Sequence, residues 1–144
     1  MDILNVQTTA EIELAKEAIL EFRTNLEPEN VVEQVLEMIT SGGFELACIP
    51  SDDGTKAAAF VGFRVINMLR TGKMIYIDDL FTLPEYRGRG YAGKLLDYVD
   101  QLAVQRGIKS VHLDSGFALH PAHRLYLSKG YFLACHHFAK MMKE

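Results

Sequence analysis

The sequence lacks the features that mark several large classes of protein. Its two cysteines, Cys48 and Cys135, form no metal-type pair, and a chain of this size needs no disulfide, so both should be reduced thiols. No apolar run approaches membrane-spanning length, and the first residues hold no basic segment of a signal peptide. We therefore expect no membrane association and a cytoplasmic, or otherwise reducing, location.

Positive charge is also in short supply. Lys and Arg number 15 against 19 Asp and Glu, which gives a formal net charge of −4 and a pI near 5.7. A surface that binds nucleic acid needs clustered cations to neutralise phosphates, so we expect no nucleic acid partner. Internal repeats, low-complexity tracts and Pro/Gly/Ser linkers are absent as well, and 144 residues suit one domain. We predict a single domain over residues 1–144.

Hydrophobic periodicity and turn residues predict an alternation of strands and helices. Thr8 and Glu11 form a capping-box pattern for the first helix, and the Asn30 side chain is expected to cap the second. The expected strands are 3–6, 44–49, 57–68, 74–83, 111–114, 131–134 and 137–142, and the expected helices are 8–23, 30–41, 90–107 and 121–130.

The order of these elements, βααβββαβαββ, predicts an α/β fold with a mixed sheet. The turn Ser51-Asp52-Asp53-Gly54 should join an antiparallel hairpin. The strand from Met74 should connect through the long helix to the strand at Val111 by a parallel βαβ crossover. We therefore expect an antiparallel first half and a parallel pair near the end.

A glycine- and arginine-rich loop lies between the central strand and the long helix. Glycines let the backbone approach a ligand, and the unpaired N–H groups and dipole of a helix N-terminus attract an anion. We predict a phosphate or pyrophosphate site formed by Arg87, Gly88, Arg89, Gly90, Tyr91, Ala92 and Gly93.

The loop differs from the two commonest phosphate-binding motifs. No Lys-Ser/Thr follows the glycines and no third glycine has the dinucleotide spacing, which disfavours ATP hydrolysis and nicotinamide chemistry. An RNA-binding Arg-Gly tract is disfavoured too, since it would be repeated within a basic surround. A plain tight turn with solvated arginines is the remaining alternative.

With the residues around it, the loop resembles the GNAT superfamily of N-acetyltransferases, whose signature is Arg/Gln-x-x-Gly-x-Gly/Ala after a central strand. Arg87, Gly90 and Ala92 occupy these positions, and Ala122-x-x-x-Tyr126-x-x-x-Gly130-Tyr131 is similar to a second block of the family. The resemblance covers essentially the whole chain. Leu113-Asp114-Ser115-Gly116 and Ala122-His123-Arg124 look most like a bacterial subgroup that includes aminoalkylphosphonate acetyltransferases.

The resemblance implies acetyl-CoA as co-substrate and a sheet splayed beside Leu80, Phe81 and Thr82, whose backbone would bind pantetheine. It also implies that Tyr126 protonates the CoA sulfur. The alternative for Tyr126 is ring packing, and both can hold together. The segments that would shape the acceptor pocket, Phe22 to Val32 and Arg64 to Lys73, show no substrate signature.

Many members of the family that this chain resembles carry a carboxylate, as a general base, where this chain has Tyr76. Strict alternation along the strand would place Tyr76 and Asp78 on one face and Asp79 on the other. Asp78 is therefore our candidate base, directly or through water, with Tyr76 beside it. Either carboxylate could instead be a structural partner of a loop or of an arginine.

The five histidines include His120, His123, His136 and His137, yet their spacing matches no catalytic metal signature, so we expect no metal. His123 could serve as a pocket residue or proton shuttle. We expect acetyl transfer from acetyl-CoA to a primary amine of a small molecule by direct attack in a ternary complex. The alternatives are a protein or peptide acetyltransferase and a non-catalytic acyl-CoA sensor, and a homodimer is left open.

Overall fold

The computed structural model describes residues 2–143. They fall into two compact units, one that runs to Leu113 and one that begins at Asp114, and each is described by itself. The single domain therefore stays a prediction. The elements are β1 (Leu4–Val6), α1 (Thr9–Phe22), α2 (Val31–Ser41), β2 (Phe44–Pro50), β3 (Ala57–Met68), β4 (Gly72–Thr82), the 3-10 helix η1 (Pro84–Tyr86), α3 (Tyr91–Gln105), β5 (Val111–Leu113) and, in the second unit, α4 (His120–Ser128).

The first unit is built on a five-stranded mixed sheet in the order β1-β2-β3-β4-β5. Neighbours pair antiparallel as far as β4, and β5 pairs with β4 in parallel. The predicted α/β class, the β2–β3 hairpin and the crossover through α3 are confirmed. In the hairpin turn, the Asp53 carboxylate accepts hydrogen bonds from the Ser51 hydroxyl at 2.7 Å and the Thr55 amide at 3.1 Å.

The two N-terminal helices begin differently. The capping box of α1 is confirmed: the Glu11 amide donates to Thr8 Oγ1 at 3.2 Å, and the Thr8 amide donates to Glu11 Oε1 at 3.0 Å. The predicted side-chain cap of α2 is wrong, because Asn30 makes no such bond. Its backbone lies in the helical region (φ −110°, ψ −11°), whereas a side-chain cap normally requires an extended residue.

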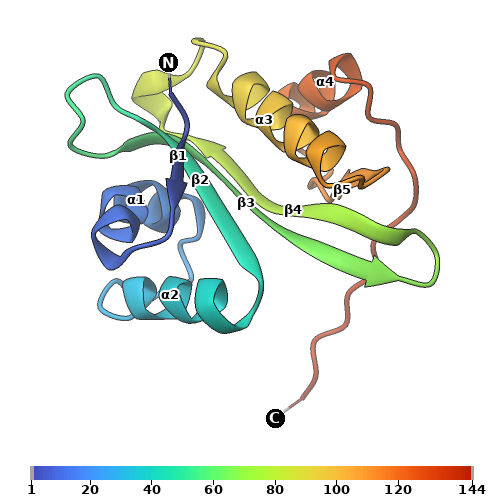
Figure 1. Cartoon of the computed structure of the whole chain (residues 1–144), viewed down its shortest axis with the longest axis horizontal. Coiled ribbons are helices and arrows are strands. Elements are labelled where there is room, and N and C mark those ends of the chain that lie inside the picture. The colour runs from blue at the N-terminus through green and yellow to red at the C-terminus, as the bar shows by residue number, and fades with distance from the viewer. Residues whose placement is uncertain (1, 144) are drawn as a thin grey trace. The chain divides into compact units, whose positions relative to one another are not determined.

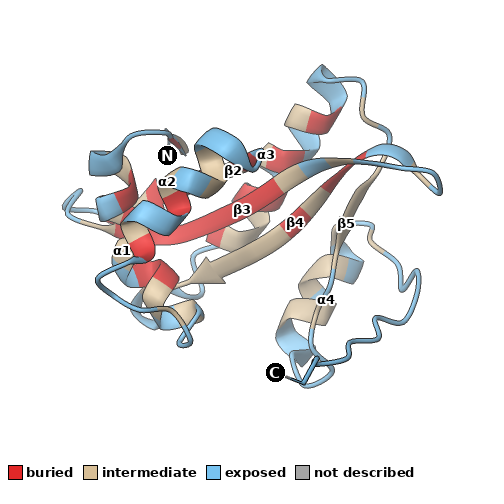
Figure 2. Cartoon of the chain, turned by 90° about the horizontal axis from the view of Figure 1, so that it is seen from below, coloured by how far each residue is buried: buried red, intermediate tan, exposed pale blue. Residues whose placement is uncertain are grey.

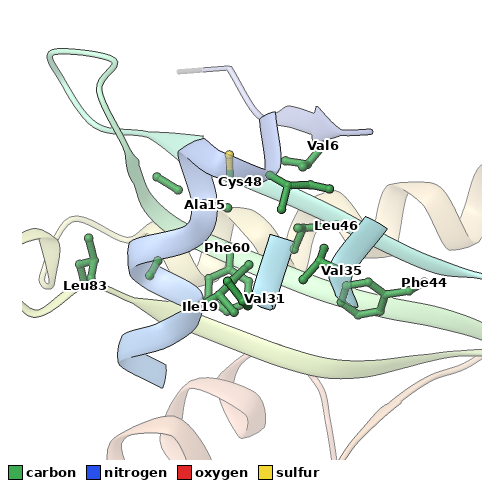
Figure 3. Packing of buried hydrophobic residues seen from close by; sticks show 13 residues of the cluster. Val6, Ala15, Ile19, Val31, Val35, Phe44, Leu46, Cys48, Phe60 and Leu83 are labelled. Atoms are coloured by element: carbon green, nitrogen blue, oxygen red, sulfur yellow. The ribbon is translucent and has the colours of Figure 1, made fainter. Parts of the chain in front are cut away.

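Helices cover both faces of this sheet. Figure 1 shows α1 and α2 on one face and α3 on the other. Burial is concentrated in β2, in the first half of β3 and on the sides of the helices that face the sheet (Figure 2). We call the face of the sheet that α1 and α2 cover the α1/α2 face. Its core joins Ile19 and Val35 of the helices to Leu46 and Phe60 of β2 and β3 (Figure 3). The charged residues described below lie on the same face.

The two strands predicted at Tyr131–Ala134 and His137–Met142 are wrong. Residues 131–143 contain no strand, and Phe132, Leu133 and Phe138 are exposed. A high content of β-forming residues does not make a strand by itself, because a strand also needs a hydrogen-bonded neighbour and a surface to pack against. The observed order is therefore βααβββαβα.

The helices do not have the character of membrane spans. Within residues 2–143, no helix is both long and apolar enough to cross a bilayer.

Candidate active site

A β-bulge interrupts β4 at its functional end. Phe63 of β3 pairs with Ile77 and the adjacent Gly62 pairs with Asp79, so Asp78 is an extra residue on β4. Residues that pair across a ladder point to the same face, and hence Asp79 lies on the face of Gly62. The prediction that Asp79 points away from Tyr76 and Asp78 is wrong, because the bulge breaks the alternation.

Two arginines bind the two carboxylates on the α1/α2 face. Arg64, which pairs with Tyr76 across the ladder, donates from Nε and Nη2 to the two oxygens of Asp78 at 2.8 and 2.7 Å. Arg23, just past the end of α1, donates from Nε to Asp79 Oδ1 at 2.7 Å and from Nη2 to the Asp78 carbonyl at 2.8 Å. The bulge is thus held by a charge-balanced network of two arginines and two aspartates.

The two carboxylates differ in their capacity to accept a proton. Both oxygens of Asp78 accept hydrogen bonds from Arg64. Asp79 is more deeply buried, with its side chain 16% exposed. Burial raises the pKa of Asp79, although the hydrogen bond from Arg23 acts in the opposite direction. Among the described residues Arg23 engages only Oδ1 of Asp79, whereas Arg64 engages both oxygens of Asp78, so Asp79 is the better placed of the two to accept a proton.

The gap predicted beside β4 has a clear origin in the pairing of the strands. β5 pairs with β4 only at Ile75–Ile77, so from Asp78 onward β4 has no β5 neighbour among the described residues. The stretch Leu80–Thr82 pairs with β3 on its other side. On the β5 side its backbone groups consequently have no strand partner among the described residues.

The predicted phosphate loop has the geometry of an anion site. Gly88 and Gly90 have φ of 82° and 76°, a left-handed conformation that favours glycine, and Gly90 is the N-cap of α3. Within residues 2–143 no side chain caps this helix end, and Gly90 itself has none to offer. The N–H groups of the first turn, from Tyr91 to Gly93, therefore face outward at the positive end of the helix dipole.

The two loop arginines are exposed but held by neighbours. Arg87 donates from Nε to the Thr82 carbonyl at 3.2 Å, and its guanidinium lies 5.5 Å from the centre of the Phe81 ring. Arg89 pairs with Asp52 of the β2–β3 turn at 3.0 Å. These contacts hold the guanidinium groups of Arg87 and Arg89 within the loop, where both would attract an anionic ligand.

Tyr126 lies in the second unit, on α4. It is half-buried, its ring centre lies 5.9 Å from that of Tyr131, and burial raises the pKa of its phenol. The hydroxyl consequently stays protonated at neutral pH, as a proton donor requires. Its role toward a thiolate stays a prediction.

Two histidines of the second unit contact oxygen atoms of other residues in that unit. A ring nitrogen of His123 lies 2.8 Å from the Gly116 carbonyl, and Nδ1 of His137 lies 2.8 Å from Asp114 Oδ2. Across residues 2–143 there is no group of three or more His, Cys, Asp or Glu side chains placed to hold a metal ion. The proton-shuttle role of His123 and the absence of a metal stay predictions.

The two arginines of the network could not be identified from the sequence. Arg23 and Arg64 fall within the two segments expected to shape the acceptor pocket, but neither segment carries a recognisable motif. The register of β3 against β4 sets Arg64 opposite Tyr76, and this register would have indicated the pair of Arg64 with Asp78. Arg23 reaches Asp79 across 56 positions of sequence, a contact that local patterns cannot reveal.

Comparison with known proteins gives consistent results. Residues 13–131 match the sequence profile described as "Acetyltransferase (GNAT) family". The chain is 29% identical over 121 residues to the uncharacterized N-acetyltransferase YhdJ of Bacillus subtilis, covering 83% of this chain and 84% of that protein. It is 26% identical over 68 residues to the thialysine N-epsilon-acetyltransferase of Mus musculus, covering 45% and 40%. A crystal structure of a probable acetyltransferase matches over 100% of both chains with a TM-score of 0.85 and 16% identity.

Proposed function

This chain belongs to the acetyltransferase (GNAT) family and is an acetyl-CoA-dependent N-acetyltransferase, and we propose that its acceptor is a primary amine of a small molecule. The use of acetyl-CoA is supported by the uncapped, glycine-flanked N-terminus of α3 and by the edge of β4 that β5 leaves unpaired. The first provides an anion site for the pyrophosphate of CoA. The second provides backbone groups for its pantetheine arm, at Leu80 to Thr82.

The small acceptor is supported by a cavity on the α1/α2 face, next to the bulge. Its volume is about 220 Å³, below the roughly 300–1,000 Å³ of sites that hold drug-sized molecules. A mammalian relative is named as an acetyltransferase of thialysine, itself a small molecule. The aminoalkylphosphonate-like subgroup stays a prediction, since no feature of the described structure bears on it.

In the proposed reaction the chain supplies a proton acceptor and a proton donor. A carboxylate of the bulge takes the proton of the ammonium, and the neutral nitrogen attacks the thioester carbonyl, so that the C–N bond forms and the C–S bond breaks. The new amide nitrogen releases its extra proton to water, and Tyr126 gives its phenolic proton to the departing thiolate and regains one from solvent. Asp78 stays our sequence-based candidate for the base, but the contacts described above favour Asp79.

The proposal is tested by incubating the protein with acetyl-CoA and a library of small amines and measuring the released thiol. Turnover of at least one amine supports it. Saturable CoA binding without turnover of any amine would leave the acyl-CoA sensor, and turnover confined to peptides would leave the peptide acetyltransferase.

The base is tested with Asp78→Asn and Asp79→Asn, which keep hydrogen bonding but cannot accept the proton. We expect Asp79→Asn to lower kcat roughly a hundredfold and to abolish the rising limb of the pH profile, while Asp78→Asn loses much less. Glu17→Gln is the matched control, since Glu17 forms an exposed pair with Lys56 at 3.1 Å. The reverse order of the two aspartates would restore Asp78 as the base.

A further inference from the structure

The cavity on the α1/α2 face has a largely apolar wall, and two charged residues line one part of it. We call that charged part the rim. It lies between α1, α2 and the sheet, and eight of its twelve lining residues are apolar, six of them buried. The principal wall residues are Ile19, Val31, Val35, Phe44, Leu46 and Phe60. A space of about 220 Å³ with this lining suits an apolar group of a few carbon atoms.

The rim brings together one cation and one anion. Arg23 and Asp79 are the charged residues among those that line the cavity, and their ion pair is 2.7 Å long. The Arg23 side chain is 43% exposed, whereas that of Asp79 is 16% exposed. Nη1 of Arg23 bonds to no other described residue, so this group is open to a ligand.

A ligand with a single charge would fit this rim poorly. A simple ammonium that approaches Asp79 also meets the adjacent guanidinium, and a simple carboxylate bound by Arg23 also meets Asp79. Like charges at short range oppose binding in both cases. A molecule with an ammonium and a carboxylate a short distance apart satisfies both groups.

We propose that this cavity selects an amino acid with an apolar side chain as the acceptor, with Arg23 binding its carboxylate and Asp79 receiving its ammonium. This inference rests on the proposed acetylation of a small amine. The side chain of the amino acid occupies the apolar cavity. The α-nitrogen is thereby held at the level where β4 and β5 separate, beside the strand that carries Leu80.

The chemical step balances without a further reactant. The ammonium gives one proton to Asp79, and the nitrogen then attacks the thioester carbon. As the C–S bond breaks, the new amide nitrogen releases its extra proton to water. The thiolate receives one proton from Tyr126, the proposed donor. Asp79 returns its proton to solvent, so that the products are the N-acetyl amino acid and the CoA thiol.

The first test uses the unaltered protein and pairs of acceptors that differ only in the carboxylate. The pairs are leucine with 3-methylbutylamine, methionine with 3-(methylthio)propylamine, and phenylalanine with phenethylamine. We expect kcat/KM to be roughly tenfold to a hundredfold higher for the amino acid, the usual effect of a hydrogen-bonded charged contact. Leucine amide, which keeps the amine and lacks the carboxylate, should behave like the decarboxylated amine.

The outcomes separate this inference from the function on which it rests. If the decarboxylated amines or leucine amide react as well as the amino acids, acetyl transfer stands and the amino acid specificity is overturned. If no amine of any kind reacts while acetyl-CoA binds, the proposed function itself fails.

The second test replaces Arg23. Because Arg23 also pairs with Asp79, Arg23→Gln should lower turnover of every acceptor, but it should lower kcat/KM for leucine roughly tenfold to a hundredfold more than kcat/KM for 3-methylbutylamine, which has no carboxylate to lose. Arg23→Lys, which keeps the charge, should recover part of the loss. Arg106→Gln is the matched control, since Arg106 pairs with Glu45 at 2.7 Å beyond the C-terminal end of α3 and lines no part of the cavity. An equal fall in kcat/KM for both acceptors in Arg23→Gln would overturn the carboxylate contact, with circular dichroism confirming that each variant is folded.

Discussion

Replacing Gly62 by alanine should destabilise the protein through a collision in the core. A Cβ at this position would overlap Cζ of Phe44, would lie 2.7 Å from Cε1 of the same ring, and would lie 3.2 Å from Asp79 Oδ2. Phe44 is 5% exposed and cannot swing into solvent without losing its packing. Overpacking of this kind typically costs about 1–3 kcal/mol, and the lower flexibility of alanine offsets about 0.5–1 kcal/mol. We expect a net loss of roughly 1–2 kcal/mol.

The loss is measured by urea unfolding monitored by circular dichroism, in a double-mutant cycle with Phe44→Leu. Leucine is shorter than phenylalanine, so Gly62→Ala should cost little in the Phe44→Leu background. The acetyl-transfer rate of Gly62→Ala should fall as well, because the added methyl group also crowds Asp79. The reasoning is refuted if Gly62→Ala is as stable as the unaltered protein, or if it loses the same free energy in both backgrounds.

Three further predictions concern single positions. Gly90→Val, at φ 76°, should abolish CoA binding in calorimetry, whereas Gly107→Val, at φ 67° beyond the other end of α3, should carry similar strain and bind normally; equal binding by both would contradict the loop site. Tyr126→Phe should lower kcat roughly a hundredfold and leave CoA affinity unchanged, and unaltered turnover across the pH range would remove Tyr126 as the acid. Burial raises the pKa of Cys48 to about 11 from its ordinary value of 9.0, so the unfolded thiol ionises first as pH rises, and the free energy of unfolding should fall by about 2 kcal/mol between these values. Cys48→Ala should show a smaller fall, and an identical pH dependence would contradict the shift.

The parts of the fold with local signals could be predicted from the sequence. The capping box at Thr8 and the turn chemistry at Ser51 to Gly54 specify a helix start and a hairpin through contacts between near neighbours. The loop from Arg87 to Gly93 was equally visible, because its glycines and arginines are contiguous. Each of these depends on a few adjacent residues.

The parts that depend on distant partners could not be predicted. The bulge at Asp78 is a shift in the register of β3 against β4 between Gly62 and Phe63. No residue type near Asp78 requires this shift. The face of Asp79 was predicted wrongly for that reason. Similarly, apolar residues such as Phe132 and Phe138 suggested strands, but the segment has no ladder partner among the described residues.

The bulge also means that β4 contains one residue more than its ladder uses. If Asp78 were deleted, Ile77 and Asp79 would become neighbours, and they already pair with the neighbouring residues Phe63 and Gly62. A chain shortened at this point could therefore keep every cross-strand pair on both sides and recover the regular two-residue period. It would lose the carboxylate that Arg64 binds. The sheet can thus gain or lose the bulge without a change of register. The residues at the bulge can therefore change in evolution while the fold is kept.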